Sequence, residues 1–498
     1  MSTQQQELAI RDYLGADELE GPILVVEAAG DAAYGEVVEV LTSGDAGPAR
    51  KRLGRVLETG DARAVIELWG ESSGLQPRDV RVRFMGHPFQ APVAREMLGR
   101  VFDGLGRPRD NLPIPLAEAL VDVNGAALNP VVRRYPHNFI QTGISAIDGM
   151  NTLVRGQKLP IFSGAGLPHD ELAAQIVRQA HIADSDSTDS GTTDNPPGNP
   201  PETRADTTDT SFAIVFAALG VPHDTADFFY NSFAANGALR QTALFLNLAD
   251  DPPMERIITP RVALSLAEFL AFERGMHVLV IMTDMTSYAE ALRELASRRN
   301  EVPGRKGYPG YLYSDLASLY ERCGSVAGRP GSITQMPILT MLNDDITHPV
   351  PDLTGYITEG QIVLSRELQR QGIYPPIAVL PSLSRLMKDG IGAGLTRDDH
   401  PHLANQLYAA YAQVQQVQSL AAIIGEEALS SIDKAYLTFG RAFENQFVTQ
   451  RADEARTITQ TLDLGWAVLA QLPSQELTRL SPAEIQAHYQ GKLDHSYG

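Results

Sequence analysis

Residues 159–176 contain the pattern with the most chemical content. They predict a short buried strand, a glycine-rich turn and a helix. This is the layout of a phosphate-binding P-loop, in which Gly-x-x-x-x-Gly-Lys-Ser/Thr follows a strand. Ser163 and Pro168 occupy the two glycine positions of that pattern. His169 replaces the lysine and Asp170 replaces the Ser/Thr. The arrangement predicts a nucleotide-binding fold.

The groups that bind phosphate in a P-loop are absent from this stretch. A working loop uses converging backbone N–H groups, a lysine and a hydroxyl that helps to hold magnesium. Pro168 has no N–H group and His169 carries no fixed charge. Asp170 and Glu171 place negative charge at the helix N-terminus, where a phosphate would otherwise sit. We therefore predict a degenerate loop with weak nucleotide binding or none, whose candidate contacts are Gly164, Ala165, Gly166, His169 and Asp170.

We expect no metal site at this loop, because His169 has no second ligand at helical spacing. Residues 277–284 nevertheless form an apolar run that ends in Asp284. That is the form of a Walker B strand, whose carboxylate helps to hold magnesium. Asp284 can equally cap the helix expected over residues 288–299. Both interpretations of Asp284 stay open from the residues alone.

Residues 381–387 set one arginine, Arg385, among small and apolar residues at the edge of the expected α/β domain. An arginine can stabilise the transition state of phosphoryl transfer, and it can do so from a neighbouring subunit. The alternative is a surface or interface salt bridge, which the residues alone favour. A second basic group consists of Arg298, Arg299, Arg305 and Lys306, which we interpret as a docking loop for an acidic partner.

Composition excludes several classes of function. The chain has 498 residues and a formal net charge of −20, which argues against a nucleic-acid binder. Cys323 is the single cysteine, so no internal disulfide can form and a reducing compartment is expected. Residues 1–20 are polar and acidic, without the pattern of a signal peptide. No run of about 18 apolar residues predicts a membrane span, although a peripheral role at a membrane stays open.

Length and changes of pattern along the chain predict a mixed fold with three domains. Residues 1–86 show closely spaced short strands separated by Gly/Asp turns, typical of a small β-barrel or sandwich. The expected strands are 23–26, 36–41, 53–57, 64–68 and 80–84. Residues 381–498 show helical patterns at 402–424, 434–450, 457–472 and 481–490, which predict an α-helical domain.

The central residues, 87–380, predict an α/β domain. Apolar runs alternate with helical patterns, which indicates a parallel sheet, and they lie at 159–162, 212–219, 243–248, 278–282 and 333–342. One helix is expected to begin with Thr259 and Pro260 as cap and first-turn residues and to end before Gly275. Residues 98–107 are expected to form a tight loop whose glycines serve turns. The polar stretch 184–210 is expected to be a long mobile surface loop.

Several segments together resemble the B subunit of V/A-type rotary ATPases and ATP synthases. They are residues 33–39, 163–176, 255–261, 278–286, 303–311, 352–361, 373–377 and 381–387. The resemblance spans almost the whole chain. It implies an N-terminal β-barrel, a central RecA-like α/β domain and a C-terminal helical domain. The polar insertion is longer than the family leads us to expect, and Ala234 and Ala235 stand where charged residues are expected.

The resemblance also implies partners and roles. The B subunit is a non-catalytic regulatory subunit in a ring of three A and three B subunits, where ATP or ADP with magnesium binds at the A–B interface. Arg385 matches the arginine that reaches the nucleotide of the catalytic A subunit, and Tyr356 is a second interface candidate. The loop around Arg305 would face the central rotor stalk, and residues 425–433 would also lie near the rotor. The complex, with its peripheral stalk, would sit on the cytoplasmic side of the membrane and move protons or sodium ions.

Two other functions remain as alternatives. A self-sufficient RecA-class ATPase or ring translocase would hydrolyse ATP as an isolated chain, which the missing lysine opposes. A purely structural spacer would be indifferent to the loss of Arg385.

Overall fold

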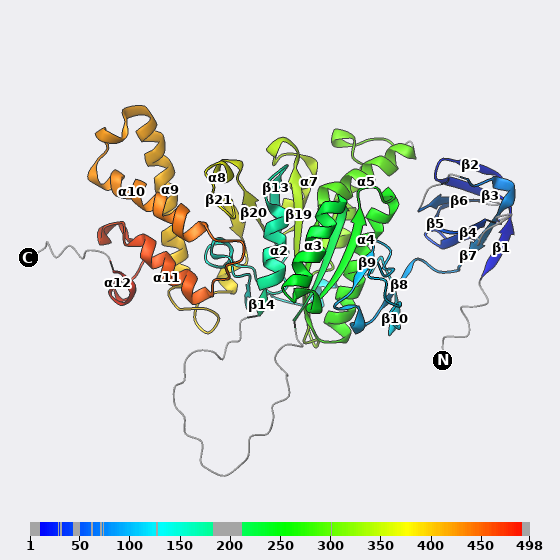
Figure 1. The fold of residues 1–498 in the computed structure, drawn as a ribbon, viewed down its shortest axis with the longest axis horizontal. Helices are drawn as coiled ribbons and strands as arrows, with labels where there is room; N and C mark the ends of the chain where they lie inside the picture. Colours follow the sequence, from blue (N-terminus) through cyan, green and yellow to red (C-terminus); the bar gives the residue numbers. More distant parts are fainter. Residues whose placement is uncertain are drawn as a thin grey trace, which may run out of the picture.

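The computed structural model describes residues 10–490 apart from 28, 30–31, 43–49, 61–62, 70–71, 73, 126–127, 183–211 and 300. Along its long axis lie an N-terminal β domain, a central α/β domain and a C-terminal group of helices (Figure 1). The expected polar insertion at 184–210 lies outside the described residues.

The N-terminal domain is one seven-stranded antiparallel sheet with the order β1-β7-β4-β5-β6-β3-β2. Its strands are β1 (Arg11–Leu14), β2 (Glu18–Glu20), β3 (Ile23–Glu27), β4 (Val37–Thr42), β5 (Arg50–Thr59), β6 (Arg63–Leu68) and β7 (Val80–Phe84). β1 and β2 follow each other in the chain yet occupy opposite ends of the sheet. The sheet therefore curls, and residues 15–17 connect its two ends. The sequence pattern did not predict these two short strands.

The central domain is built on a 10-stranded sheet whose main path is β21-β20-β13-β19-β17-β15-β16-β9. Most neighbours on this path are parallel, and β21 is antiparallel to β20. The strands are β9 (Val101–Asp103), β13 (Ile161–Gly164), β15 (Phe212–Val221), β16 (Thr242–Leu248), β17 (His277–Thr283), β19 (Ser332–Met341), β20 (Gly360–Leu364) and β21 (Ile377–Ser384). Shorter strands flank them, namely β8 (Gln90–Val93), β10 (Ala119–Asp122), β11 (Arg133–Arg134), β12 (Ile140–Gln141), β14 (His181–Ile182) and β18 (Gly324–Val326).

Helices cover both faces of this sheet, and alternate residues of each buried strand face opposite layers. In β15, Ile214 and Phe216 belong to one hydrophobic cluster, whereas Val215 belongs to the other. The first cluster contains residues of α2 (His169–Gln179) and α3 (His223–Ala235). The second contains residues of α4 (Pro253–Glu268), α5 (Met285–Arg298), α6 (Leu312–Tyr320) and α7 (Pro349–Ile357). The expected parallel α/β sheet is confirmed.

The helix expected to begin at Thr259 begins earlier, which corrects the sequence prediction. α4 starts at Pro253, whose missing N–H group costs nothing at a first helical position. Pro260 lies inside the helix, and Thr259 donates its hydroxyl to the carbonyl of Glu255 at 2.8 Å instead of capping the N-terminus. Burial of Ile257 and Ile258 on the sheet holds this first half of the helix in place.

The tight loop expected at residues 98–107 contains the edge strand β9, which pairs with β16. Three residues are too few to give a sequence period, so the prediction missed this strand. Gly99 and Gly106 have φ values of 85° and 83°, as turn residues do. Gly104 serves a different purpose, because a Cβ there would overlap the hydroxyl of Thr259 on α4.

The C-terminal helices are α9 (His400–Ile424), α10 (Ser431–Ala442), α11 (Ile458–Leu469) and α12 (Pro482–His488), close to the predicted spans. Their apolar faces pack into the same cluster as α2. The short helix α1 (Ser145–Asp148) joins them to the central domain, since the hydroxyl of Ser145 lies 3.0 Å from that of Thr461. Strand β21 runs through the boundary that we expected at 380/381.

His400 gives the domain junction a pH dependence that can be measured. Its Nε2 lies 3.1 Å from the carbonyl of Gly149, and burial lowers the pKa of the ring to about 4. The unfolded chain binds a proton on this side chain below about pH 6.5, whereas the folded chain does not until about pH 4. Stability is therefore lost as pH falls through this window, by up to about 3 kcal/mol for this residue.

We expect His400→Gln to flatten the decline in unfolding free energy between pH 6.5 and 4, measured by urea denaturation of the full chain. The matched control is His402→Gln, which changes an exposed histidine on the same helix. Equal slopes for the wild type and the His400 variant would contradict the assignment.

Candidate functional site

The degenerate loop has the strand–turn–helix geometry that the sequence predicts. It connects β13 to α2, and Pro168 stands at the N-cap position of that helix without a side-chain cap. The N–H of Leu167 donates to the carbonyl of Gly164 at 3.0 Å, and the N–H of His169 donates to Leu167 at 2.8 Å. These donors bond within the loop, so they do not converge on an outside anion.

An ion pair from two later segments covers the loop. Arg366, at the start of α8 (Arg366–Arg370), bonds both carboxylate oxygens of Asp344 at 2.8 and 3.0 Å. The same guanidinium donates to the carbonyl of Ala165 at 2.9 Å, and Gln369 donates to that of Gly166 at 3.2 Å. A Cβ on Gly164 would overlap the carboxylate of Asp344. A carboxylate therefore stands against the loop on which a phosphate would have to bind.

The helix start beside this loop is also unfavourable for an anion. His169 Nδ1 lies 2.9 Å from the hydroxyl of Ser163, so the ring is engaged within the loop. Burial raises the pKa of Asp170, and His169 opposes that shift while Glu171 and Asp284 add to it. Gly164, Ala165, Gly166, His169 and Asp170 thus lie together in one loop and helix start, with the carboxylate of Asp344 beside Gly164.

Asp284 serves the fold as a helix cap. Its Oδ1 accepts the N–H of Thr286 at 2.7 Å and that of Thr340 at 3.1 Å. The first bond caps α5, and the second links the end of β17 to β19. Among the described residues, no group of three or more His, Cys, Asp or Glu side chains could hold a metal ion.

Arg385 lies at the opposite end of the sheet from the degenerate loop. It follows β21, whose Ser384 pairs with Gly360 at the beginning of β20. Because β20 and β13 run parallel, this is the end from which β13 starts, whereas the loop follows its far end. An extended chain from Lys158 to Ala165 spans about 23 Å at roughly 3.3 Å per residue. Arg385 therefore cannot serve the loop of its own chain.

The side chain of Arg385 is exposed, and within the described part of the chain it has no hydrogen-bonded or ionic partner. Its backbone N–H donates to the carbonyl of Glu359 at 3.0 Å. Tyr356, near the C-terminus of α7, lies three residues before Glu359 and is 75% exposed. The two interface candidates therefore share one end of the sheet. The salt-bridge interpretation of Arg385 finds no partner among the described residues.

Each cation of the predicted basic docking loop has an acidic partner within the chain. Arg298 pairs with Glu294 at 2.5 Å, and Lys306 pairs with Asp345 at 3.2 Å. Arg305 binds Asp352 at 2.8 Å.

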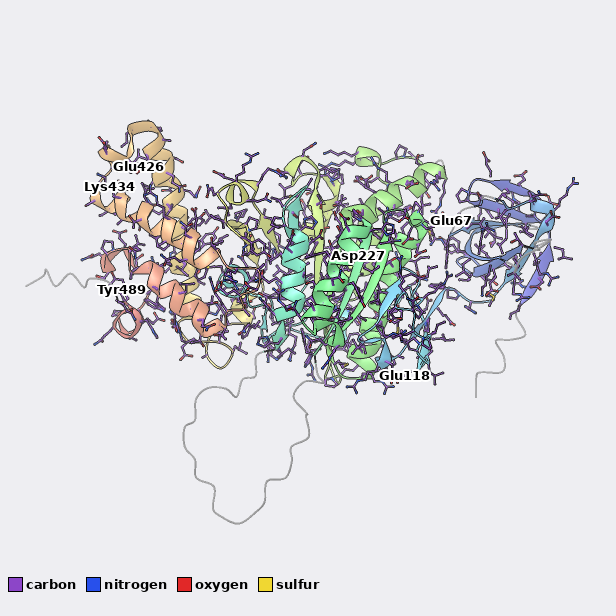
Figure 2. All side chains as sticks on the ribbon, viewed as in Figure 1. Glu67, Glu118, Asp227, Glu426, Lys434 and Tyr489 are labelled. Atoms are coloured by element: carbon purple, nitrogen blue, oxygen red, sulfur yellow. The ribbon has the colours of Figure 1, made fainter. Side chains whose placement is uncertain are left out.

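Arg299 binds both carboxylate oxygens of Glu67, which sequence reasoning could not foresee from residues so far apart. Glu67 lies where the N-terminal domain faces the central one (Figure 2). This bond therefore joins two domains, and Arg299 is unavailable to an acidic partner.

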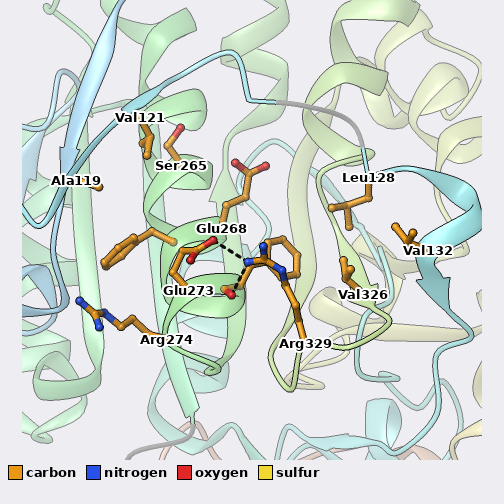
Figure 3. Close-up of a pocket in the computed structure, with 12 residues that line it drawn as sticks. Ala119, Val121, Leu128, Val132, Ser265, Glu268, Glu273, Arg274, Val326 and Arg329 are labelled. Atoms are coloured by element: carbon orange, nitrogen blue, oxygen red, sulfur yellow. Dashed lines mark hydrogen bonds and ion pairs between the residues drawn. The ribbon is translucent and has the colours of Figure 1, made fainter. Parts of the chain in front are cut away.

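A cavity of about 680 Å³ lies elsewhere, between β10 and the segment that follows α4 (Figure 3). Its wall is mainly apolar and includes Val121, Phe269 and Val326. At its rim Arg329 binds Glu273 at 2.7 Å. None of its lining residues belongs to the degenerate loop or to the segment of Arg385.

Comparison with known proteins agrees with this geometry. The family model for the nucleotide-binding domain of the ATP synthase alpha/beta family matches residues 143–384, and the model for the C-terminal domain of V and A type ATP synthase matches residues 389–489. The V-type ATP synthase beta chain of Halothermothrix orenii is 56% identical over 97% of this chain and 99% of its own length. The B subunit of the A-type ATP synthase of Aeropyrum pernix is 55% identical over 97% of this chain and 98% of its own length.

This chain belongs to the B-subunit family of V- and A-type ATP synthases. The structure of the ATP synthase subunit NeqB from Nanoarcheaum equitans is similar, with a TM-score of 0.67 and 38% identity over 88% of this chain and 99% of that one. The resemblance seen in the sequence is thus confirmed. No helix within the described residues is both long enough and apolar enough to cross a membrane.

Sequence reasoning missed the pair of Asp344 and Arg366 over the loop. These residues have no special spacing in the chain, and only the parallel alignment of β13, β19 and β20 brings them to Gly164. A run of two acids at 344–345 gave no reason to choose the first. Asp344 has a φ of 56°, so its backbone adopts the left-handed region that aims its carboxylate at Arg366.

We expect Asp344→Asn to increase the affinity of the full chain for magnesium–ADP about threefold to tenfold, because it removes a charge that opposes phosphate and releases Arg366. Asparagine tolerates the left-handed backbone, so the loop should keep its shape. Isothermal titration calorimetry measures the change. Asp345→Asn is the matched control, since it alters the net charge equally but its partner is Lys306. An equal effect of the two variants would contradict a local role for Asp344.

Proposed function

We propose that this chain is the non-catalytic, regulatory B subunit of a V/A-type ATPase/ATP synthase ring and completes the ATP site of the catalytic A subunit in trans. Family membership supports this role. The observation that carries it is the separation of the two candidate sites, since Arg385 stands free at one end of the sheet and the degenerate loop is blocked at the other. In a ring, each subunit meets its two neighbours with different faces. Arg385 therefore contributes to a nucleotide held by a neighbour.

Arginine suits this role because its planar guanidinium binds two phosphoryl oxygens at once and keeps its charge at every relevant pH. The exposed side chain needs no internal ion pair to be broken before it acts. Tyr356 lies at the same end of the sheet and would contact the same neighbour beside the nucleotide. The degenerate loop opposes the alternative of a self-sufficient ATPase, because it lacks the lysine and hydroxyl and faces Asp344.

The assembly that follows has three A and three B subunits, with ATP or ADP and magnesium at the A–B interfaces. The central sheet would be a RecA-like domain of about residues 87–380, between an N-terminal barrel of residues 1–86 and helices of residues 381–498. The partners are the A subunit, the central rotor stalk and the peripheral stalk. The complex would lie at the cytoplasmic face of a membrane, with no direct insertion of this chain and no nucleic-acid partner.

We expect Arg385→Ala to lower the turnover of a reconstituted A–B ring by about 10³–10⁵-fold, the loss typical of an arginine finger, while the ring still assembles. Steady-state ATP hydrolysis and native mass measurement test the two parts. Arg370→Ala is the matched control, because Arg370 is also exposed but belongs to α8 at the opposite end of the sheet. Near-normal turnover of the Arg385 variant would refute the in-trans role and favour a structural spacer.

A further inference from the structure

Hydrogen bonds hold the backbone at Arg385 through two neighbours, Ser384 at the end of β21 and Glu359 just before β20. Ser384 donates its hydroxyl to the carbonyl of Thr152 at 2.8 Å. Gln157 donates to the Ser384 hydroxyl at 3.0 Å and to the carbonyl of Glu359 at 3.1 Å. The same Glu359 carbonyl accepts the N–H of Arg385. The position of the Arg385 main chain therefore depends on the position of Glu359.

Glu359 is held in turn by Lys158. The ammonium group of Lys158 lies 3.0 Å from Glu359 Oε1, and the backbone N–H of Lys158 donates to Oε2 at 2.8 Å. The N–H of Glu359 donates back to the carbonyl of Lys158 at 3.1 Å. Lys158 and Glu359 are thus joined by main-chain and side-chain bonds, and each residue donates to the other. Lys158 thus contacts Glu359 with both its main chain and its side chain, and the Glu359 carbonyl accepts the N–H of Arg385.

Lys158 is a buried cation. Its side chain is only 4% exposed, and its ammonium group also binds Glu321 at 2.9 Å. Glu321 is bound on its other oxygen by Arg133 at 2.7 Å. Burial by itself lowers the pKa of Lys158, but the adjacent carboxylates outweigh it and raise the pKa overall. The lysine is therefore charged, and its ammonium group joins Glu359 to Glu321.

We propose that Lys158 is a positioning residue for Arg385, acting through Glu359. The inference rests on the proposed in-trans function and adds a residue to it that touches neither the nucleotide nor the neighbouring subunit. Lys158 lies three residues before β13, the strand that leads to the degenerate loop. The residues before β13 would thus help to position Arg385, whereas the loop after β13 is degenerate.

We expect Lys158→Met to reduce kcat for ATP hydrolysis by the reconstituted A–B ring about tenfold to hundredfold, with little change in KM, because a misplaced catalytic group costs rate on this scale. Arg299→Met is the matched control. It also removes a largely buried cation bound to a buried glutamate, but Arg299 lies at the junction with the N-terminal domain. Equal kcat values for the two variants would overturn the proposal.

A double-mutant cycle distinguishes positioning from general damage. If Lys158 acts through Arg385, Lys158→Met adds no further loss to Arg385→Ala in single-turnover assays with radiolabelled ATP. Multiplying losses would overturn the positioning role and leave the arginine finger intact. Near-normal turnover of Arg385→Ala alone would refute both the finger and the inference.

Glu359→Gln keeps the test decisive if the Lys158 variant does not assemble. It preserves the backbone carbonyl and leaves Glu321 as a partner for the lysine, so the fold should tolerate it. We expect the same selective loss of kcat and the same lack of additivity with Arg385→Ala. Wild-type kcat for an assembled Glu359→Gln ring would overturn the proposal.

Discussion

The parallel alignment of β20, β13 and β19 sets where each candidate functional group of this chain lies. Parallel strands place all their carboxyl ends at one edge of the sheet and all their amino ends at the other. The degenerate loop lies at the first edge and Arg385 at the second. A rigid sheet therefore separates the groups that would have to meet in a self-contained ATPase. The same separation suits a ring, in which each subunit works on its neighbour.

The strand, turn and helix around the degenerate loop have a structural role. Helix α2, which follows the loop, bonds the segment that joins the C-terminal helices. Gln175 donates to the carbonyls of Arg451 and Glu454, and Gln179 donates to Glu454 as well. Tyr374 completes the contact by donating to Gln175. The helix that follows the loop thus connects the central domain to the C-terminal helices.

Strands that form long apolar runs were predictable from the sequence, whereas very short strands and contacts between distant residues were not. The runs that became β15, β17 and β19 are continuous and apolar because helices cover both of their faces. β9 and β1 are too short to show a period. α4 was misjudged at Pro260, because burial of its first half outweighs the propensity of one proline. Sequence also did not reveal that the basic residues at 298–306 pair with acidic side chains of the same chain, since partners such as Glu67 are distant in the sequence.

Sequence was sufficient to predict a degenerate loop, because the side-chain chemistry at Pro168, His169 and Asp170 is local. It was also sufficient for the family, because the motifs are many and specific. Tertiary structure was needed to establish that Arg385 lies free and far from the loop, and that Lys158 is buried between Glu359 and Glu321. These relations depend on strand order and burial, which join residues far apart in the chain.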